Sequence, residues 1–235
     1  MSETVLILGG TKEAAELAAR LVREHPGWRI ITSLAGRTRE PAPLAGETRI
    51  GGFGGPGGLA EYLATEGITR LIDATHPFAR RISANAKLAA CKAGIPLEIV
   101  TRPPWQKQAG DDWIEVGSLE EARDALPAGA RTLLALGSQY IAVFATRTDI
   151  HFVVRMVDPP AKPPAKPLAG PLAGPLALPG HELVIGKPGS LEDEKALLAH
   201  HAITHIVCRN SGGAASYAKI EAARETGITV VMVQR

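Results

Sequence analysis

The chain has 235 residues, of which 45% are hydrophobic, and a formal net charge of +2. This length and apolar content favour a folded globular protein over a disordered one. The weak charge and the aromatic content of 4% exclude a strongly basic surface rich in stacking side chains, so we expect no nucleic-acid partner. The sequence has no run of about 18 apolar residues, and no basic leader precedes Thr4. We therefore expect a cytoplasmic protein with no membrane partner.

The cysteines and histidines form no recognisable ligand pattern. Cys91 and Cys208 lie far apart, and neither belongs to a C-x-x-C motif, so we interpret both as ordinary thiols. In "HHAITH", His200 to His205, a predicted helix end passes into a strand, so the histidines would not share one face. The sequence therefore predicts no metal site.

In the first half of the chain, short β-branched runs alternate with alanine-rich segments, which is typical of the α/β class. Apolar residues from Ala14 to Val22 follow the spacing of a helix packed on a sheet. We predict parallel strands joined by helices, with ligands bound at the carboxyl ends of the strands. The predicted strands are Thr4–Leu8, Arg29–Leu34, Thr48–Ile50, Arg70–Ala74 and Leu97–Val100.

The pattern breaks into proline, glycine and charge at Thr101–Trp113 and then resumes. We place a domain boundary there and predict two Rossmann-like lobes, residues 1–105 and 106–235. Each lobe would have a parallel sheet flanked by helices, with a cleft between the lobes. Helices are expected at the capping box Ser118 to Glu121, after Gly137, at Ser190, and from about Ala214 to Glu225. The second set of strands is Trp113–Val116, Arg131–Leu136, His151–Val157, His181–Gly186, His205–Arg209 and Ile228–Val233.

A proline-rich segment, Asp158 to Gly180, interrupts this order with repeated P-A-K-P and P-L-A-G units. Proline at this density removes backbone donors and favours extended chain. We interpret the segment as a surface loop, with a functional lid as the alternative.

The first candidate site is the loop Gly9-Gly10-Thr11, which joins a strand to a helix. Paired glycines let the backbone approach a phosphate at the positive N-terminus of the helix, where Thr11 can act as the cap. The full G-x-G-x-x-G motif is absent. A simple tight turn is the alternative interpretation.

The second candidate site is "IITSLAGRTR", Ile30 to Arg39, at the end of the second strand. A Rossmann site for NAD places an acidic residue about 20 residues after the glycines, to bind the ribose 2′-hydroxyl. Here the loop offers Ser33, Gly36, Arg37 and Arg39 instead. Arginine can bind a 2′-phosphate that a carboxylate would repel, so the loop favours NADP over NAD. Two solvated surface arginines are the alternative.

Two further loops follow strands in the first lobe. Gly51 to Gly58, "GGFGGPGG", contains six glycines but lacks the Lys-Ser/Thr of a P-loop. We interpret it as a segment, including Gly52, whose backbone forms one wall of the cofactor site. The loop "DATHPFA" brings Thr75 and His76 to the edge of the sheet. His76 could donate a proton or bind a carboxylate, or it could only stabilise the loop.

In the second lobe, "CRNSGGAASYAK" reads as a strand, a small polar loop and the start of a helix. The predicted helix N-terminus could bind a carboxylate or phosphate. Tyr217 and Lys219 have Y-x-K spacing, which differs from the Y-x-x-x-K of short-chain dehydrogenases. The candidate binding residues are Arg209, Asn210, Ser211, Gly212 and Gly213.

The ordered set "LGGTKEA", "SLAGRT", "GGFGG", "DATHPFA", "NSGG" and "YAKIEAA" resembles the precorrin-6A reductase family of cobalamin biosynthesis. The resemblance covers both lobes. It implies an oxidoreductase that uses NADPH to reduce one double bond of a tetrapyrrole macrocycle, converting precorrin-6A to precorrin-6B. It also implies that cofactor and macrocycle bind in the cleft between the two lobes. The proline-rich segment is longer than the family pattern requires.

The resemblance and the loops together give expected roles for the candidate residues. Gly9, Gly10 and Thr11 would hold the pyrophosphate. Gly52 and Thr75 would flank the nicotinamide region, and His76 or Tyr217 would supply the proton. Alternatives are another NADP-dependent reductase or a two-lobe protein that binds an anionic ligand. The 2′-phosphate would meet Ser33, Gly36, Arg37 and Arg39, and the macrocycle would meet His76, Pro77, Phe78, Arg209, Asn210, Ser211, Gly212, Gly213, Tyr217 and Lys219.

Overall fold

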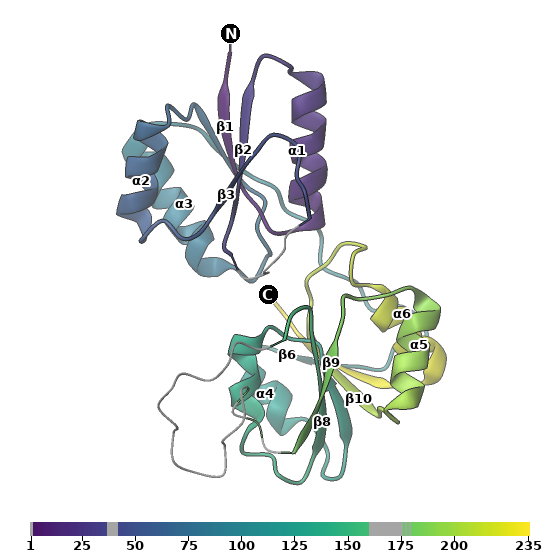
Figure 1. Cartoon of the computed structure of the whole chain (residues 1–235). Helices are drawn as coiled ribbons and strands as arrows, with labels where there is room; N and C mark the ends of the chain where they lie inside the picture. Colours follow the sequence, from purple (N-terminus) through teal and green to yellow (C-terminus); the bar gives the residue numbers. More distant parts are fainter. Residues whose placement is uncertain (1, 37–41, 160–175, 177, 179) are drawn as a thin grey trace. The chain divides into compact units, whose positions relative to one another are not determined.

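The computed structural model describes residues 2–36, 42–159, 176, 178 and 180–235. The chain divides into two compact units, Met1–Arg102 and Pro103–Arg235, each with its own sheet and helices (Figure 1). The division falls within Thr101–Trp113, the stretch in which the sequence predicts a boundary. That the two halves are separate domains stays a prediction.

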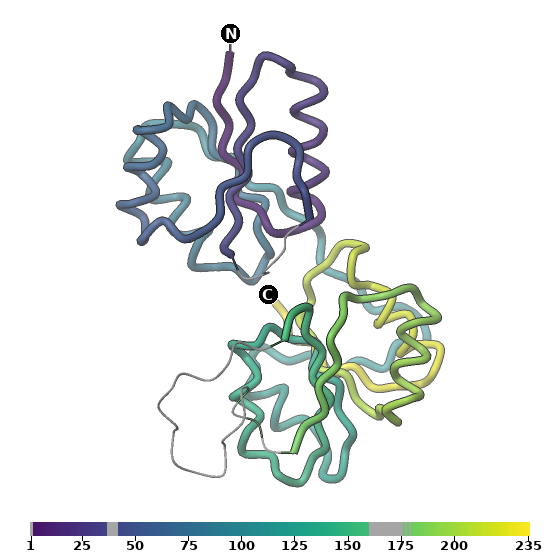
Figure 2. Tube along the Cα trace, in the orientation of Figure 1, coloured from purple at the N-terminus to yellow at the C-terminus, as the bar shows by residue number. Residues whose placement is uncertain are grey.

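The first unit contains a five-stranded parallel sheet with strand order β3-β2-β1-β4-β5. Figure 2 traces the chain from β1 through α1 to β2. The strands are β1 (Thr4–Leu8), β2 (Arg29–Leu34), β3 (Glu47–Ile50), β4 (Arg70–Asp73) and β5 (Leu97–Ile99). The helices are α1 (Lys12–Glu24), α2 (Pro56–Thr65) and α3 (Arg80–Ala93).

The central strand β1 is apolar on both faces because helices cover the sheet on both sides. Val5 and Ile7 pack with α1, whereas Leu6 and Leu8 pack with α2 and α3. Figure 1 shows α1 on one side of the sheet and the other two helices on the opposite side. Because helices cover both faces, the loops at the carboxyl ends of the strands remain as the place where a ligand can bind.

The second unit contains a six-stranded parallel sheet with strand order β6-β11-β10-β7-β8-β9. The strands are β6 (Trp113–Val116), β7 (Arg131–Leu134), β8 (His151–Met156), β9 (His181–Ile185), β10 (His205–Arg209) and β11 (Thr229–Val233). The α-helices are α4 (Leu119–Asp124), α5 (Leu191–His200) and α6 (Ala218–Thr226). Helices α5 and α6 cover one face, where Leu198 and Ile220 pack against Val153, Ile206 and Val230.

The predicted fold class is confirmed, with two corrections at helices. The helix expected after Gly137 is a 3₁₀ helix, η1 (Ser138–Phe144), a short segment that contains the β-branched residues Ile141 and Val143. Helix α6 begins at Ala218 and not at about Ala214, because Gly212 and Gly213 adopt positive φ angles of 66° and 72° before a turn.

Two observations concern the described residues only. None of the helices within them has the length and apolar content needed to cross a bilayer. Their His, Cys, Asp and Glu side chains also form no group of three or more that could hold a metal ion.

Candidate functional site

The strand order of the first unit changes direction between β1 and β4. The chain leaves β1 toward β2 and leaves β4 toward β5, so the two loops depart in opposite directions from adjacent strands. Ligands of open α/β sheets bind at such a switch point, beyond the carboxyl ends of the strands. The loops that meet here are Gly9–Thr11 and Ala74–Phe78.

The glycine pair after β1 has two different structural roles. A Cβ atom on Gly9 would lie 2.8 Å from Cγ2 of Thr32, so a side chain there would displace β2. Gly10 has a φ of 103°, which L-residues rarely adopt, and an added Cβ would meet no atom within 4 Å. Gly9 therefore sets the packing of the turn, and Gly10 leaves bare backbone facing open space.

Thr11 joins the start of α1 to the end of β4. Its hydroxyl accepts a hydrogen bond from the Ala14 amide at 3.1 Å and donates one to the Ala74 carbonyl at 2.8 Å. The threonine is therefore the N-cap of a 13-residue helix whose positive end lies beside the end of β4. Open glycine backbone at a capped helix N-terminus fits a pyrophosphate.

The loop after β4 is held by a buried carboxylate. Asp73 is 3% exposed, and its Oδ1 accepts hydrogen bonds from the Thr75 amide at 3.1 Å and the Thr75 hydroxyl at 2.6 Å. The Phe78 amide donates to Nδ1 of His76 at 3.3 Å. That bond needs an unprotonated Nδ1, so a neutral His76 carries its proton on Nε2. Pro77 lies in this loop, which continues to α3.

An arginine that the sequence analysis missed lies at the end of β3. Arg49 is paired in register with Ser33 of β2, and its NH1 group lies 3.4 Å from the Ser33 hydroxyl oxygen. Its guanidinium also donates to the carbonyls of Gly51 at 2.6 Å and Gly52 at 2.8 Å. The sequence placed Arg49 only within the strand predicted at Thr48–Ile50. Its position beside Ser33 depends on the register between β2 and β3, which the structure gives.

The end of β2 is described only as far as Gly36. Residues 33–36 contain no carboxylate, and Ser33 is 6% exposed. Gly36 has a φ of 71°. Arg37 and Arg39, the predicted phosphate ligands, lie outside the described residues.

The loop Asn210–Gly213 of the second unit, which the sequence predicts to contact the macrocycle, is hydrogen-bonded to Trp105 and lies against Pro103. Asn210 is 1% exposed; its Oδ1 accepts from the Trp105 amide at 2.7 Å, and its Nδ2 donates to the Trp105 carbonyl at 3.0 Å. The Trp105 indole donates to the Gly213 carbonyl at 2.7 Å. A Cβ on Gly212 would lie 2.2 Å from the Pro103 carbonyl oxygen. This loop therefore holds the first residues of its own unit in place.

The side chains around this loop differ in accessibility. Lys219 is 4% exposed, donates to the Ser216 carbonyl at 2.6 Å and lies 4.9 Å from the Trp105 ring centroid. Burial lowers the pKa of its ammonium. Tyr217 is partly exposed, and its hydroxyl accepts from Arg224 at 2.6 Å. Ser211 is 6% exposed, and Arg209 lies 4.5 Å from the Tyr140 ring centroid.

The structure therefore groups the predicted residues by unit. Gly9–Thr11, Thr75 and His76 meet at the switch point, and Ser33 and Gly52 are linked through Arg49 at the neighbouring strand ends. Because α6 begins at Ala218, Asn210–Gly213 do not lie at its first turn, which corrects the predicted placement at a helix N-terminus. The roles of all these residues stay predictions.

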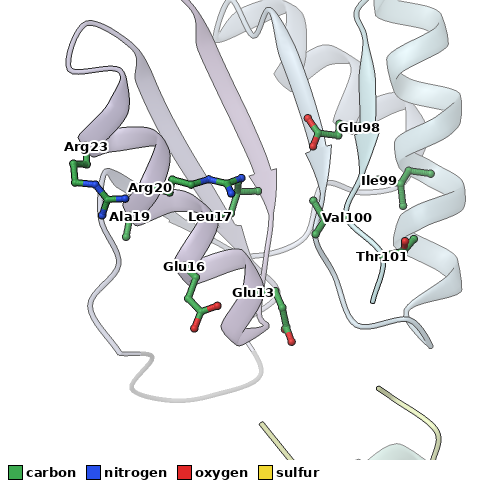
Figure 3. Close-up of a pocket in the computed structure, with 10 residues that line it drawn as sticks. All are labelled: Glu13, Glu16, Leu17, Ala19, Arg20, Arg23, Glu98, Ile99, Val100 and Thr101. Atoms are coloured by element: carbon green, nitrogen blue, oxygen red, sulfur yellow. The ribbon is translucent and has the colours of Figure 1, made fainter. Parts of the chain in front are cut away.

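A groove of about 740 Å³ lies elsewhere on the first unit, between α1 and β5. Figure 3 shows Glu13, Glu16 and Arg20 extending from α1, with Glu98 and Val100 on the opposite wall. Its lining contains none of the predicted site residues. The candidate site is therefore defined by the strand ends and their loops.

Comparison with known proteins identifies the family. Residues 4–235 match the family model described as precorrin-6x reductase CbiJ/CobK. The chain is 46% identical to a precorrin-6A reductase of Sinorhizobium sp., with 98% of this chain and 84% of that protein covered. It is 43% identical to a precorrin-6A reductase of Rhodobacter capsulatus, with 98% and 87% covered. The solved structure of CobK precorrin-6A reductase has a TM-score of 0.90 at 42% identity, with 99% of this chain and 88% of that chain covered. The resemblance seen in the sequence is confirmed: the chain belongs to the precorrin-6x reductase family.

Proposed function

We propose that this chain is a cytoplasmic reductase that uses NADPH to convert precorrin-6A to precorrin-6B. Membership of the family makes it an oxidoreductase of cobalamin biosynthesis that acts on a carbon–carbon double bond, and such a reaction needs a reducing cofactor. The observation that carries the choice of NADPH is the end of β2, where a nearly buried serine and an arginine occupy the region in which an NAD site places a carboxylate.

The first unit would hold the dinucleotide along the strand ends. The open backbone at Gly10 and the capped N-terminus of α1 would bind the pyrophosphate, and Gly9 would keep the turn close to β2. Ser33, Gly36, Arg37 and Arg39 would bind the 2′-phosphate. When bound, the reduced nicotinamide supplies the hydride.

The loop after β4 would flank the reacting ring. The hydrogen bond from the Thr75 hydroxyl to Asp73 holds Thr75 in place. Thr75 and Gly52 would then line the nicotinamide region. As an imidazolium, His76 could donate a proton to the macrocycle and return to the neutral ring, with Pro77 and Phe78 as apolar contacts. Tyr217 is the second candidate for the proton donor.

The 209–219 segment of the second unit would contact the macrocycle. Precorrin side chains end in carboxylates, which suit the guanidinium of Arg209 and the phenol of Tyr217. Gly212 and Gly213 would provide close backbone approach. Asn210 and Lys219 are nearly buried and contact Trp105, so we assign them to fixing the loop. Ser211 is also nearly buried, and its carbonyl accepts a hydrogen bond from Arg235 at 2.8 Å.

The test is loss of NADPH absorbance when precorrin-6A is added to the purified protein. We expect turnover with NADPH and a much lower kcat/KM with NADH. Replacing Arg37 and Arg39 together by alanine should weaken NADPH binding by about 1.5–3 kcal/mol, the scale of a charged hydrogen bond, and leave NADH binding nearly unchanged. Equal turnover with both cofactors in the unaltered protein would overturn the assignment of NADPH.

The proton donor is tested by His76→Ala and Tyr217→Phe. We expect one of the two to lower kcat by about 10²–10⁴-fold, the usual contribution of general acid catalysis, with little change in the Kd for NADPH. An unchanged kcat in both variants would remove both residues as donors.

A further inference from the structure

We propose that Arg49 determines cofactor specificity by providing the positive charge that selects a 2′-phosphate over a 2′-hydroxyl. This inference rests on the proposed use of NADPH. It assigns the choice between NADP and NAD to a residue outside the loop Arg37–Arg39. It stands on three features of Arg49: its position, its rigid attachment and the absence of a carboxylate partner within the part of the chain that the structure describes.

The position follows from strand register. Ser33 is the fifth residue of β2, and Arg49 is its partner on the parallel neighbour β3. The adenosine ribose of a Rossmann-bound dinucleotide lies at the end of this second strand. The Arg49 NH1 group is 3.4 Å from the Ser33 hydroxyl oxygen, so its charge lies beside the expected ribose position.

The guanidinium is held in a fixed orientation. Two carbonyl oxygens, those of Gly51 and Gly52, accept its hydrogen bonds at 2.6 Å and 2.8 Å. The Arg49 Cζ atom also lies 3.9 Å from the ring centroid of Phe53 and 5.0 Å from that of Tyr62. Stacking on aromatic faces and a bidentate fork are properties of arginine that lysine lacks. Little side-chain entropy is then lost when an anion binds.

The charge of Arg49 has no carboxylate partner among the described residues. Four other arginines of the first unit do have one: Arg23 pairs with Glu24, Arg29 with Glu47, Arg70 with Glu3, and Arg102 with Glu13. Arg49 is partly buried and is surrounded by carbonyls, a hydroxyl and two aromatic rings. A partly desolvated cation without a counter-ion gains most from a ligand that brings one. A 2′-phosphate does so, and a 2′-hydroxyl does not.

The experiment measures binding of NADP⁺ and NAD⁺ to the full chain by titration calorimetry. Arg49→Gln removes the charge while keeping a side-chain donor, and Arg49→Lys keeps the charge but loses the fork. We expect Arg49→Gln to raise the Kd for NADP⁺ by about 10- to 100-fold, the scale of a charged hydrogen bond, and the Kd for NAD⁺ by less than threefold. Arg49→Lys should retain part of the preference for NADP⁺.

A control variant and a second readout separate charge selection from a structural role. Arg23→Gln makes the same charge change at an exposed site on α1 and should leave both Kd values unchanged. The salt dependence of NADP⁺ binding should be weaker in Arg49→Gln than in the unaltered chain.

Equal weakening of both cofactors in Arg49→Gln would assign Arg49 to holding the Gly51–Gly52 turn and overturn the inference. An unchanged preference for NADP⁺ in Arg49→Gln would also overturn the proposed role of Arg49. The proposed use of NADPH would then still stand. If the unaltered chain binds both cofactors equally, the proposed cofactor itself is wrong, and the inference falls with it.

Discussion

Asn210 uses its side-chain amide to bond both backbone groups of Trp105, and it also donates to Oε1 of Gln234 at 3.1 Å. Replacing it by alanine would leave the Trp105 amide and carbonyl buried without these partners. We expect Asn210→Ala to lower the free energy of unfolding by about 2–3 kcal/mol, since each unpaired buried group costs about 1–3 kcal/mol. Urea denaturation followed by circular dichroism measures this difference.

Gln234→Ala is the matched control, because it removes only the third of these hydrogen bonds and Gln234 is partly exposed. It should cost less than about 1 kcal/mol. Equal losses in both variants would show that the bonds to Trp105 do not carry the stability.

At the residue scale, the place of each loop between a strand and a helix could be predicted from the sequence, but the contacts within the loops could not. Gly10 and Thr11 could be placed at a strand-to-helix turn because a glycine pair before a helix has few structural solutions. Arg49 could not, since its importance depends on register with Ser33 and on the rings of Phe53 and Tyr62. The hydrogen bonds of Asn210 to Trp105 could not be predicted either, because a small polar loop gives the same sequence pattern whether it faces solvent or its own chain.

At the scale of elements, one hydroxyl couples α1 to the end of β4. Thr11→Val keeps the shape of the side chain but removes the N-cap and the bond to the Ala74 carbonyl. We expect a loss of about 1–2 kcal/mol in the free energy of unfolding, typical of a lost cap. The Kd for NADP⁺ should also rise, because the start of α1 would be less firmly placed.

Thr11→Ser provides the control, because serine keeps the hydroxyl and caps helices as well as threonine does. Both quantities should stay close to those of the unaltered chain. A similar loss in Thr11→Ser would mean that the methyl group, and not the cap, matters.

The strands were the most predictable elements. Thr4–Leu8, Arg29–Leu34 and His205–Arg209 have the predicted limits, because short runs rich in β-branched and apolar residues stand out from the alanine-rich segments around them. The helix starts were harder. Ala214 to Tyr217 has a helix-forming composition, but the preceding glycines turn the chain, and α6 begins only at Ala218.

At the scale of the whole molecule, both units have parallel sheets, but the loops that follow their strands differ in how open the backbone is. In the first unit the loop after β1 leaves the backbone at Gly10 open. In the second unit the loop after β10 is occupied by Pro103 and Trp105 from the same unit. Similar α/β architecture therefore leaves open backbone at a strand end in one unit and a loop that is hydrogen-bonded to its own unit in the other.

The acid stability of the molecule should depend on Glu182, which joins three other elements of the second unit. Its carboxylate accepts from Nδ1 of His201 at 2.7 Å, Nε2 of His151 at 2.6 Å and Arg131 at 3.1 Å. The bonds to His201 and His151 are the main causes that lower the pKa of Glu182 to about 2, from an ordinary value of 4.5. The folded state thus prefers the ionised carboxylate more than the unfolded state does.

A lowered carboxyl pKa contributes stability that is fully present above pH 4.5 and is lost as the pH falls toward 2. Glu182→Gln should therefore lower the urea midpoint clearly at pH 5.5, and the difference from the unaltered chain should shrink steadily at lower pH. Glu192→Gln, at a carboxylate that is 80% exposed, should change the midpoint little under the same conditions. A difference for Glu182→Gln that stayed constant between about pH 5.5 and 3 would show that the ionised carboxylate does not link these elements.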